Sequence, residues 1–204
     1  MKIVCIGRNY FEHAKELNNP IPSEPILFVK PETAILPKRN PLYYPDFTAD
    51  LQHEVEIVIK ICKLGKNIQK KFANKYYNEI GLGIDFTARD LQTVCKEKGH
   101  PWEIAKAFDN SAVIGKKFIP KENFKDLLNI QFHLKKNGDV IQTGNTKDML
   151  FHFDQLIEYA SKFFTLKIGD LIFTGTPSGV GPVAINDKLE GFIEGEKLLE
   201  VNIK

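Results

Sequence analysis

QHEVEIVI (residues 52–59) and GIDFTARD (residues 83–90) are the two segments that say most about the fold and chemistry of this chain. In an extended strand residues i and i+2 share a face, so Glu54 and Glu56 are expected to point the same way. Adjacent carboxylates repel each other, and a divalent cation with a third oxygen ligand would offset that repulsion. Asp85 is the natural third ligand, because it stands among glycines and apolar residues where we expect no ion pair with a surface lysine.

A Glu-x-Glu strand also has a simpler interpretation. Alternating acidic and apolar residues are typical of an antiparallel strand with one solvated face, and without further support this interpretation is the stronger one. Under it, the three carboxylates are surface charges of a binding or structural protein. The two interpretations differ in burial and in whether the carboxylates meet.

Length, composition and charge restrict the class of protein. The chain has 204 residues, which favours one domain over residues 1–204. Hydrophobic residues make up 43% and charged residues 26%, as in ordinary globular proteins. The 28 basic and 26 acidic residues leave a net charge of +2, so no general field attracts nucleic acid or an anionic membrane. We expect neither as a partner.

The cysteines and the amino terminus indicate a compartment. Cys5, Cys62 and Cys95 are odd in number and far apart, which argues against a disulfide framework and a zinc ribbon. The apolar run before Gly7 is too short for a signal peptide, and no apolar run reaches membrane-spanning length. The expected location is the cytoplasm.

A possible acid–base pair lies near the amino terminus. A strand at 3–6 precedes helix-forming residues 8–17, in which His13 and Glu16 would be neighbours on one face. A carboxylate beside an imidazole raises its basicity and fixes its orientation, as a water-activating base requires. An ordinary surface pair would have the same spacing. Prolines 20, 22 and 25 predict an extended linker after the helix.

Further polar residues are candidates for ligand contacts. A helix starting at Thr87, which is expected to cap it, would direct its amide dipole toward an anionic ligand, with Gln92 as a carboxylate contact. Lys106 lies among alanines and needs water or an anion for its ammonium group. In TGTPSGVG (174–181), backbone amides and the hydroxyl of Thr174 or Thr176 are expected to converge on a small carboxylate, because no phosphate-loop lysine follows the glycines.

Several other elements can be predicted from apolar runs and turn residues. KNGD (136–139) is a strong hairpin turn. Strands are expected at 26–29, 54–61, 80–86, 130–134, 142–145 and 171–173, with two more after residue 187, and helices at 72–77 and 149–164.

Six motifs occur in a fixed order along the chain: VCIGRNYFEH (4–13), FVKP (28–31), HEVE (53–56), DFTARDLQ (85–92), QTGNTKDM (142–149) and TGTPSGVG (174–181). Together they resemble the fumarylacetoacetate hydrolase family. The similarity is to its short single-domain branch of acylpyruvate hydrolases, oxaloacetate decarboxylases and 2-hydroxyhepta-2,4-diene-1,7-dioate isomerases. The motifs cover nearly the whole chain.

This resemblance implies a fold and a set of site residues. The fold is α+β and β-rich, a mixed β-sandwich roll with peripheral helices that commonly forms a homodimer. Residues 8–25 are expected to form a mobile lid. The implied roles are metal ligands for Glu54, Glu56 and Asp85, catalytic residues for His13, Glu16 and Lys106, and substrate contacts for Arg8, Gln92 and Thr176. The implied cofactor is Mg²⁺, with Mn²⁺ or Ca²⁺ as possible substitutes.

The implied reaction starts from a small 2-oxo acid whose carboxylate and keto oxygens bind the metal, which then stabilises a pyruvate enolate. Loss of an acyl group to water is acylpyruvate hydrolysis, the expected activity. Loss of CO₂ or of a proton would make the protein an oxaloacetate decarboxylase or an isomerase at the same site. Phe86, Thr143, His100 and Glu103 depart from the family pattern and affect the expected pocket shape. A metal-stabilised binding protein is the non-enzymatic alternative.

Overall fold

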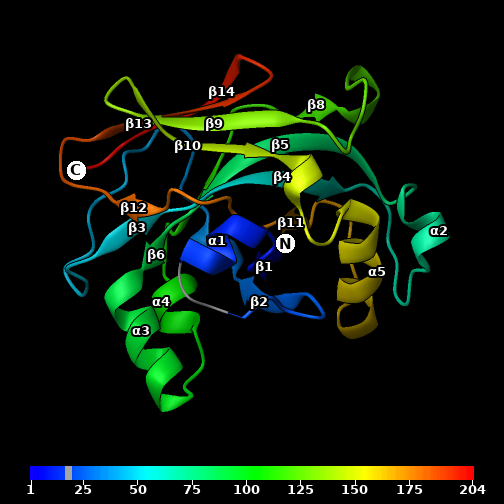
Figure 1. Cartoon of the computed structure of the whole chain (residues 1–204), viewed down its shortest axis with the longest axis horizontal. Coiled ribbons are helices and arrows are strands. Elements are labelled where there is room, and N and C mark those ends of the chain that lie inside the picture. Colours follow the sequence, from blue (N-terminus) through cyan, green and yellow to red (C-terminus); the bar gives the residue numbers. More distant parts are fainter. Residues whose placement is uncertain (17–19) are drawn as a thin grey trace.

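Three β-sheets with helices at their edges make up the computed structural model, which describes residues 1–16 and 20–204 (Figure 1). The expected lid at 8–25 and the predicted first helix therefore extend partly over residues outside the described ranges. Within these ranges, none of the helices combines the length and apolar character needed to cross a membrane. Cys5, Cys62 and Cys95 are free thiols, in agreement with the sequence.

The largest sheet is mixed and holds the carboxylate-bearing strands. Its order is β2-β1-β11-β4-β5-β7, with β8 also paired to β5. The β1–β11 pair is parallel and the others are antiparallel. The strands are β1 (Ile3–Gly7), β2 (Ile26–Lys30), β4 (Val55–Ile61), β5 (Tyr77–Asp85), β7 (Ala112–Ile114), β8 (Ile119–Pro120) and β11 (Leu171–Phe173).

Two smaller sheets complete the β-structure. One has the order β10-β9-β13-β14 and the other β12-β3-β6. The predicted hairpin turn is confirmed, since Asn137 and Gly138 have φ values of 54° and 97° between β9 and β10. The strands are β3 (Leu51–His53), β6 (Thr87–Ala88), β9 (Gln131–Lys136), β10 (Asp139–Asn145), β12 (Gly181–Pro182), β13 (Lys188–Ile193) and β14 (Glu196–Asn202).

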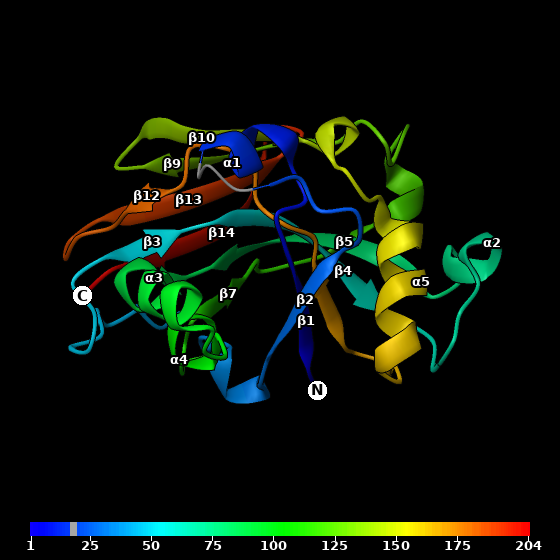
Figure 2. The same cartoon turned by 60° about the horizontal axis from the view of Figure 1, so that its bottom comes forward.

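The helices lie around the sheets (Figure 2). Helices α2 and α5 pack together at one end of the molecule, and α3 and α4 lie at the other end. Helix α1 lies between β2 and β10, in front of the large sheet. The α-helices are α1 (Phe11–Glu16), α2 (Lys70–Ala73), α3 (Arg89–Lys98), α4 (Glu103–Lys106) and α5 (Phe153–Phe163), and short 3₁₀ turns occupy 32–34, 121–123 and 146–148.

Both faces of the large sheet are buried. In β1, Val4 and Ile6 join the main hydrophobic core, whereas Ile3 and Cys5 join a second, smaller cluster on the opposite face. Because both faces are buried, the sequences of these strands are nearly continuous apolar runs. The expected β-rich sandwich with peripheral helices is confirmed.

Two predicted helices begin later in the structure. The first begins at Phe11, because Arg8 adopts a left-handed conformation with φ of 62°. The helix predicted from residue 149 begins at Phe153. The side-chain amide of Asn9 accepts a hydrogen bond from the backbone nitrogen of Phe151 at 2.8 Å. It also donates a hydrogen bond to the backbone carbonyl of Phe151 at 2.9 Å. These contacts hold the segment before Phe153 out of a helix.

Two other local predictions were wrong. The helix predicted over residues 72–77 is replaced by α2, which ends at Ala73, and by β5, which begins at Tyr77. Thr87 lies in β6 and does not cap α3, whose N-cap residue is Ala88. The strand predicted at 54–61 is confirmed as β4, which begins one residue later at Val55.

Candidate active site

Three buried carboxylates meet at one point of the structure. One oxygen from each of Glu54, Glu56 and Asp85 lies within 4.8 Å of the others, and the residues are 5%, 1% and 0% exposed. The antiparallel pairing of β4 with β5 brings them together, because the backbone nitrogen of Asp85 donates to the carbonyl of Glu54 at 2.8 Å. The interpretation of these residues as surface charges is wrong.

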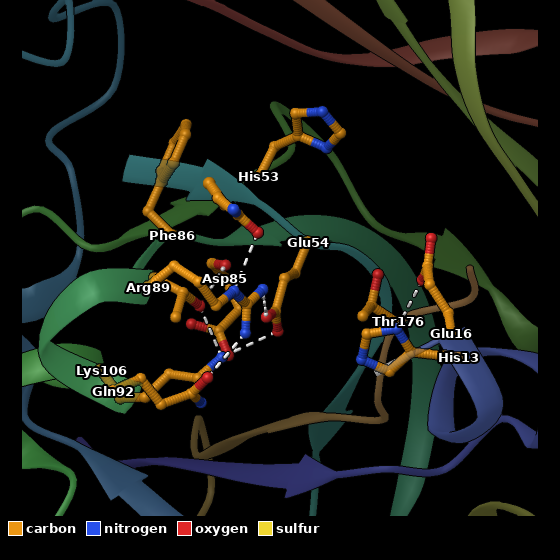
Figure 3. A network of polar contacts seen from close by, with 12 residues as sticks. His13, Glu16, His53, Glu54, Asp85, Phe86, Arg89, Gln92, Lys106 and Thr176 are labelled. Atoms are coloured by element: carbon orange, nitrogen blue, oxygen red, sulfur yellow. Dashed lines mark hydrogen bonds and ion pairs between the residues drawn. The ribbon is translucent and has the colours of Figure 1, made fainter. Parts of the chain in front are cut away.

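Cations from three different segments surround two of these carboxylates, and Figure 3 shows two of these cations, Arg89 and Lys106. The Glu54 oxygens lie 2.6 Å from Nη2 of Arg89 and 2.8 Å from Nζ of Lys106. The Asp85 oxygens lie 2.8 Å from Nζ of Lys30 and 2.9 Å from Nζ of Lys106. The sequence argument considered only surface lysines and did not anticipate that two buried lysines distant in sequence reach Asp85 inside the fold.

These ion pairs set the protonation states of the groups involved. Burial alone would raise the pKa of Glu54, but the charges of Lys106 and Arg89 hold it well below its usual range. Burial alone would lower the pKa of Lys106, but Asp85 and Glu54 raise it above its usual value. Glu54 is therefore a carboxylate and Lys106 an ammonium ion at neutral pH.

Glu56 differs from its two neighbours. Among the described residues it has no ion-pair partner, and its side chain accepts a hydrogen bond from the backbone nitrogen of Gly175 at 2.7 Å. Burial, together with the charges of Asp85 and Glu54, raises the pKa of Glu56 well above its usual value. A nearby cation would therefore stabilise ionised Glu56 more than it would stabilise Glu54 or Asp85, which already have cationic partners.

The carboxylate cluster fits a hard divalent cation on the basis of its donor atoms. Three carboxylates supply the oxygen ligands that Mg²⁺ and Mn²⁺ prefer, and the incomplete neutralisation of Glu56 provides the electrostatic reason for binding. Glu54, Glu56 and Asp85 are the residues that would hold the ion.

His13 and Glu16 form the expected pair on α1. Nδ1 of His13 lies 3.2 Å from Oε2 of Glu16, so Nε2 is the ring nitrogen left for the cavity. The other oxygen of Glu16 accepts a hydrogen bond from the backbone nitrogen of Gly179 at 3.0 Å. Burial lowers the pKa of His13, and Glu54 and Glu16 counter part of this effect. His13 is thus a neutral base near pH 7.

One cavity brings His13 and Lys106, two of the three predicted catalytic residues, together with the predicted substrate contacts. It lies between α1, α3, α4 and the end of β1, and Figure 3 shows His13 and Lys106 on opposite sides of Glu54. Its lining includes Arg8, His13, Glu54, Gln92, Lys106 and Thr176, and also Phe28, Arg89, Lys96 and Trp102. The roles of Arg8, Gln92 and Thr176 as substrate contacts stay predictions.

The donors of the 174–181 loop contact β4 and Glu56. The hydroxyl of Thr174 donates to the carbonyl of Ile57 at 2.9 Å, and that of Thr176 donates to the carbonyl of Val55, also at 2.9 Å. The amide of Gly175 binds Glu56. These donors hold the loop against β4, and their expected convergence on a small carboxylate stays a prediction.

Lys30 is a site residue that the sequence did not identify. Its side chain is completely buried, and its ammonium group is paired with Asp85. It also donates to the Ser111 hydroxyl at 2.8 Å and to the carbonyl of Lys106. A lysine that ends an apolar strand directly before a proline was the available signal.

Arg89 and His53 also have roles that sequence reasoning did not assign. Arg89 donates to Gln92 Oε1 at 2.7 Å and so links Gln92 to Glu54. His53 points away from the carboxylates (Figure 3), and its Nδ1 lies 2.8 Å from Oε1 of Gln142. Gln142 in turn donates to the Thr176 hydroxyl at 3.0 Å, so this histidine supports the loop beside the cavity.

Comparison with known proteins finds similarity over the full length of the chain. The sequence model described as "Fumarylacetoacetate (FAA) hydrolase C-terminal" matches residues 2–204. The mouse protein named "Oxaloacetate tautomerase FAHD1, mitochondrial" is 43% identical over 202 residues, which cover 99% of this chain and 91% of the mouse protein. The Dictyostelium discoideum protein named "Oxaloacetate decarboxylase, mitochondrial" is 46% identical over 183 residues, covering 89% of this chain and 84% of that protein.

A solved structure extends this similarity to three dimensions. The crystal structure of fumarylpyruvate hydrolase from Pseudomonas aeruginosa in complex with Mn²⁺ and pyruvate superimposes with a TM-score of 0.93 and 36% sequence identity. The alignment covers 100% of this chain and 89% of that one. Sequence and structure therefore point to the same group of proteins.

Proposed function

Because this chain belongs to the fumarylacetoacetate hydrolase family, we propose that it is a Mg²⁺-dependent enzyme that cleaves a carbon–carbon bond in acylpyruvate-type 2,4-dioxo acids. The observation behind this proposal is that His13, which is hydrogen-bonded to Glu16, lines the same cavity as Glu54, one member of a cluster of oxygen ligands. A base and a cation site in one cavity are the two components that hydrolysis of such a bond requires.

The carboxylates, His13 and Glu16 have separate roles in the proposed reaction. When bound to Glu54, Glu56 and Asp85, a hard divalent cation supplies Lewis-acid polarisation of the carboxylate and keto oxygens of a 2-oxo acid. His13 removes a proton from water through Nε2, and Glu16 stabilises the imidazolium that results. Water adds to the acyl carbon, the bond to the pyruvyl carbon breaks, and that carbon receives a proton. The products are a carboxylic acid and pyruvate.

Lys106 provides a fixed positive charge beside the reacting oxygens. Its ammonium group is held by Glu54 and Asp85 and also donates to the Thr87 hydroxyl at 2.6 Å. Because these acceptors already orient the ammonium group, little reorganisation is needed when negative charge develops on a substrate oxygen in the cavity.

Action on oxaloacetate is the second candidate function. It is favoured by the relatives named oxaloacetate tautomerase and oxaloacetate decarboxylase, at 43% and 46% identity to this chain. The same cavity would hold oxaloacetate by its 2-oxo acid end, with proton movement or loss of CO₂ replacing the attack of water. Mn²⁺ as a substitute metal, assembly as a homodimer and a cytoplasmic location complete the proposal.

Turnover of acetylpyruvate and of oxaloacetate, each with Mg²⁺ and with EDTA, tests these candidates. Hydrolysis of acetylpyruvate that requires Mg²⁺ and is lost in His13→Ala supports the first. Metal-dependent turnover of oxaloacetate alone supports the second. A non-catalytic protein would turn over neither, and Mg²⁺ with oxalate would leave its melting temperature unchanged.

A further inference from the structure

Gln142 on β10 is a buried residue that lies between β4 and the loop formed by residues 174–181. Its side chain is 2% exposed. The amide nitrogen donates hydrogen bonds to Oγ1 of Thr176 at 3.0 Å and to the carbonyl of Pro177 at 3.1 Å. The amide oxygen accepts a hydrogen bond from the backbone nitrogen of Val55 at 3.1 Å. Gln142 therefore fastens the loop to β4.

The neighbouring hydrogen bonds fix the orientation of this amide group. The Thr176 hydroxyl donates its single proton to the carbonyl of Val55 at 2.9 Å, so it acts as an acceptor toward Gln142. The amide oxygen then faces Nδ1 of His53, which lies 2.8 Å away and carries the proton. A reversed amide would place donor against donor at Val55 and acceptor against acceptor at Pro177. The loop is thus held in one position.

Gly179 lies between two points at which this loop is held. On its carboxy-terminal side, Gly181 pairs with His53 in the ladder of β12 with β3. The backbone of Gly179 also packs closely on β10. A Cβ at this position would lie 2.7 Å from the carbonyl oxygen of Ile141 and 3.3 Å from Cγ of Gln142. The position of Gly179 therefore depends on β10 and on the Gln142 side chain.

The Gly179 amide supports the His13–Glu16 pair. Its nitrogen donates to Oε1 of Glu16 at 3.0 Å, and Oε2 of Glu16 lies 3.2 Å from Nδ1 of His13. Glu16 is the last residue of α1, and its side chain is 33% exposed. Within residues 1–16 and 20–204, these two hydrogen bonds are the ones that hold its carboxylate. A shift of the loop would remove one of them.

We propose that Gln142 is a positioning residue for the general base. By fastening the 174–181 loop to β4, it holds the Gly179 amide against Glu16, and Glu16 in turn orients the imidazole of His13. The inference rests on the proposed function, in which His13 removes a proton from water. Loss of the Gln142 amide should therefore misplace the base and reduce the rate of the chemical step.

Two neutral variants of Gln142 test this role. Gln142→Met keeps a long side chain and removes all four contacts of the amide. Gln142→Asn is the milder change, because its amide is too short to reach both β4 and the loop. The matched control is Asn145→Leu, which removes a buried amide from the same strand. The Asn145 side chain binds Asn129 and the backbone nitrogen of Lys147, so its loss leaves the loop in place.

The pKa of His13 is the first measurement, because it requires neither substrate nor metal. NMR titration of the histidine rings in EDTA gives this value, and the His13 signal is the one that disappears in His13→Gln. Glu16 raises the pKa of His13. Both Gln142 variants should therefore lower this pKa by about 0.5 or more, in the same direction as Glu16→Gln. Asn145→Leu should leave it unchanged.

Kinetics of acylpyruvate hydrolysis provide the second measurement. Gln142→Met should reduce kcat by about tenfold. Because Thr174 and Gly175 contact β4 independently of Gln142, KM should change by less than about threefold. In a Glu16→Gln background the same substitution should reduce kcat by less than about a further twofold, since both changes act on one group.

An unchanged pKa of His13 in both Gln142 variants, or an equal fall in Asn145→Leu, would overturn the proposal. Independent, multiplying losses of kcat for Gln142→Met and Glu16→Gln would overturn it as well. A protein that hydrolyses no acylpyruvate would contradict the proposed function, whereas the pKa of His13 in EDTA would still decide whether Gln142 positions the imidazole through Glu16.

Discussion

Nζ of Lys30 lies 2.8 Å from Oδ1 of Asp85, and the two side chains are 0% and 1% exposed. Lys30→Met should lower the free energy of unfolding by about 3–5 kcal/mol, because it leaves a buried carboxylate with one cation fewer. Denaturant unfolding in EDTA measures this change. The control is Lys60→Met, which breaks a half-exposed pair with Glu79 and should cost less than about 1 kcal/mol. Equal losses in both variants would contradict the structural role of Lys30.

Glu56→Gln should stabilise the metal-free protein and weaken its response to Mg²⁺. A group whose pKa is raised on folding loses stability as the pH rises through its folded value, so an ionised Glu56 is unfavourable at neutral pH. The variant should gain about 1 kcal/mol or more in EDTA, since one pKa unit corresponds to about 1.4 kcal/mol. Melting temperatures with EDTA and with Mg²⁺ test both effects. A wild-type-sized rise with Mg²⁺ would exclude Glu56 as a ligand.

The rate of hydrolysis should depend on the protonation of His13. Burial lowers its pKa, so the acid limb of the pH–rate profile should lie below the usual histidine value of about 6.5. Because Glu16 raises this pKa, Glu16→Gln should move the limb to lower pH and reduce kcat by about tenfold or more. A limb that stays in place in Glu16→Gln would show that another group titrates.

The same pKa shift affects stability with a defined sign. A histidine whose pKa is lowered on folding binds its proton more readily when unfolded, so its contribution to stability is lost as the pH falls below about 6.5. The difference in unfolding free energy between wild type and His13→Gln should therefore shrink or reverse between neutral pH and about pH 5. An unchanged difference would indicate a solvated His13.

Gly175→Ala should be more damaging than Gly169→Ala. Both glycines have positive φ values, 96° and 89°, so both substitutions introduce backbone strain of about 1–3 kcal/mol. A Cβ at Gly175 would also lie 2.6 Å from Cβ of Asn9, whereas a Cβ at Gly169 meets nothing within 4 Å. Gly175→Ala should further weaken Mg²⁺ binding, because the Gly175 amide orients Glu56. Calorimetric Mg²⁺ titration of both variants tests this difference.

Features encoded by short-range patterns could be predicted from the sequence. The strand 171–173, the Asn137–Gly138 turn and the paired strands of the carboxy-terminal region follow from apolar runs and turn residues. The convergence of Glu54, Glu56 and Asp85 could be anticipated because residues i and i+2 share a strand face and because six motifs resemble one family.

Features that depend on distant contacts could not be predicted. Lys30 and Lys106 meet Asp85 only after β2, β5 and α4 have packed, and no local pattern specifies that meeting. The late start of α5 has the same origin, because Asn9 binds Phe151 across the fold. Tertiary hydrogen bonds override helix propensity at that position.

Glu16 uses each of its two oxygens for a different partner. Oε2 orients the imidazole of His13, and Oε1 binds the amide of Gly179 on the loop across the cavity. Any displacement of α1 that releases this loop also moves the carboxylate that supports the base. One carboxylate thus couples the position of the 174–181 loop to the orientation of the imidazole, so that a change in either is transmitted to the other.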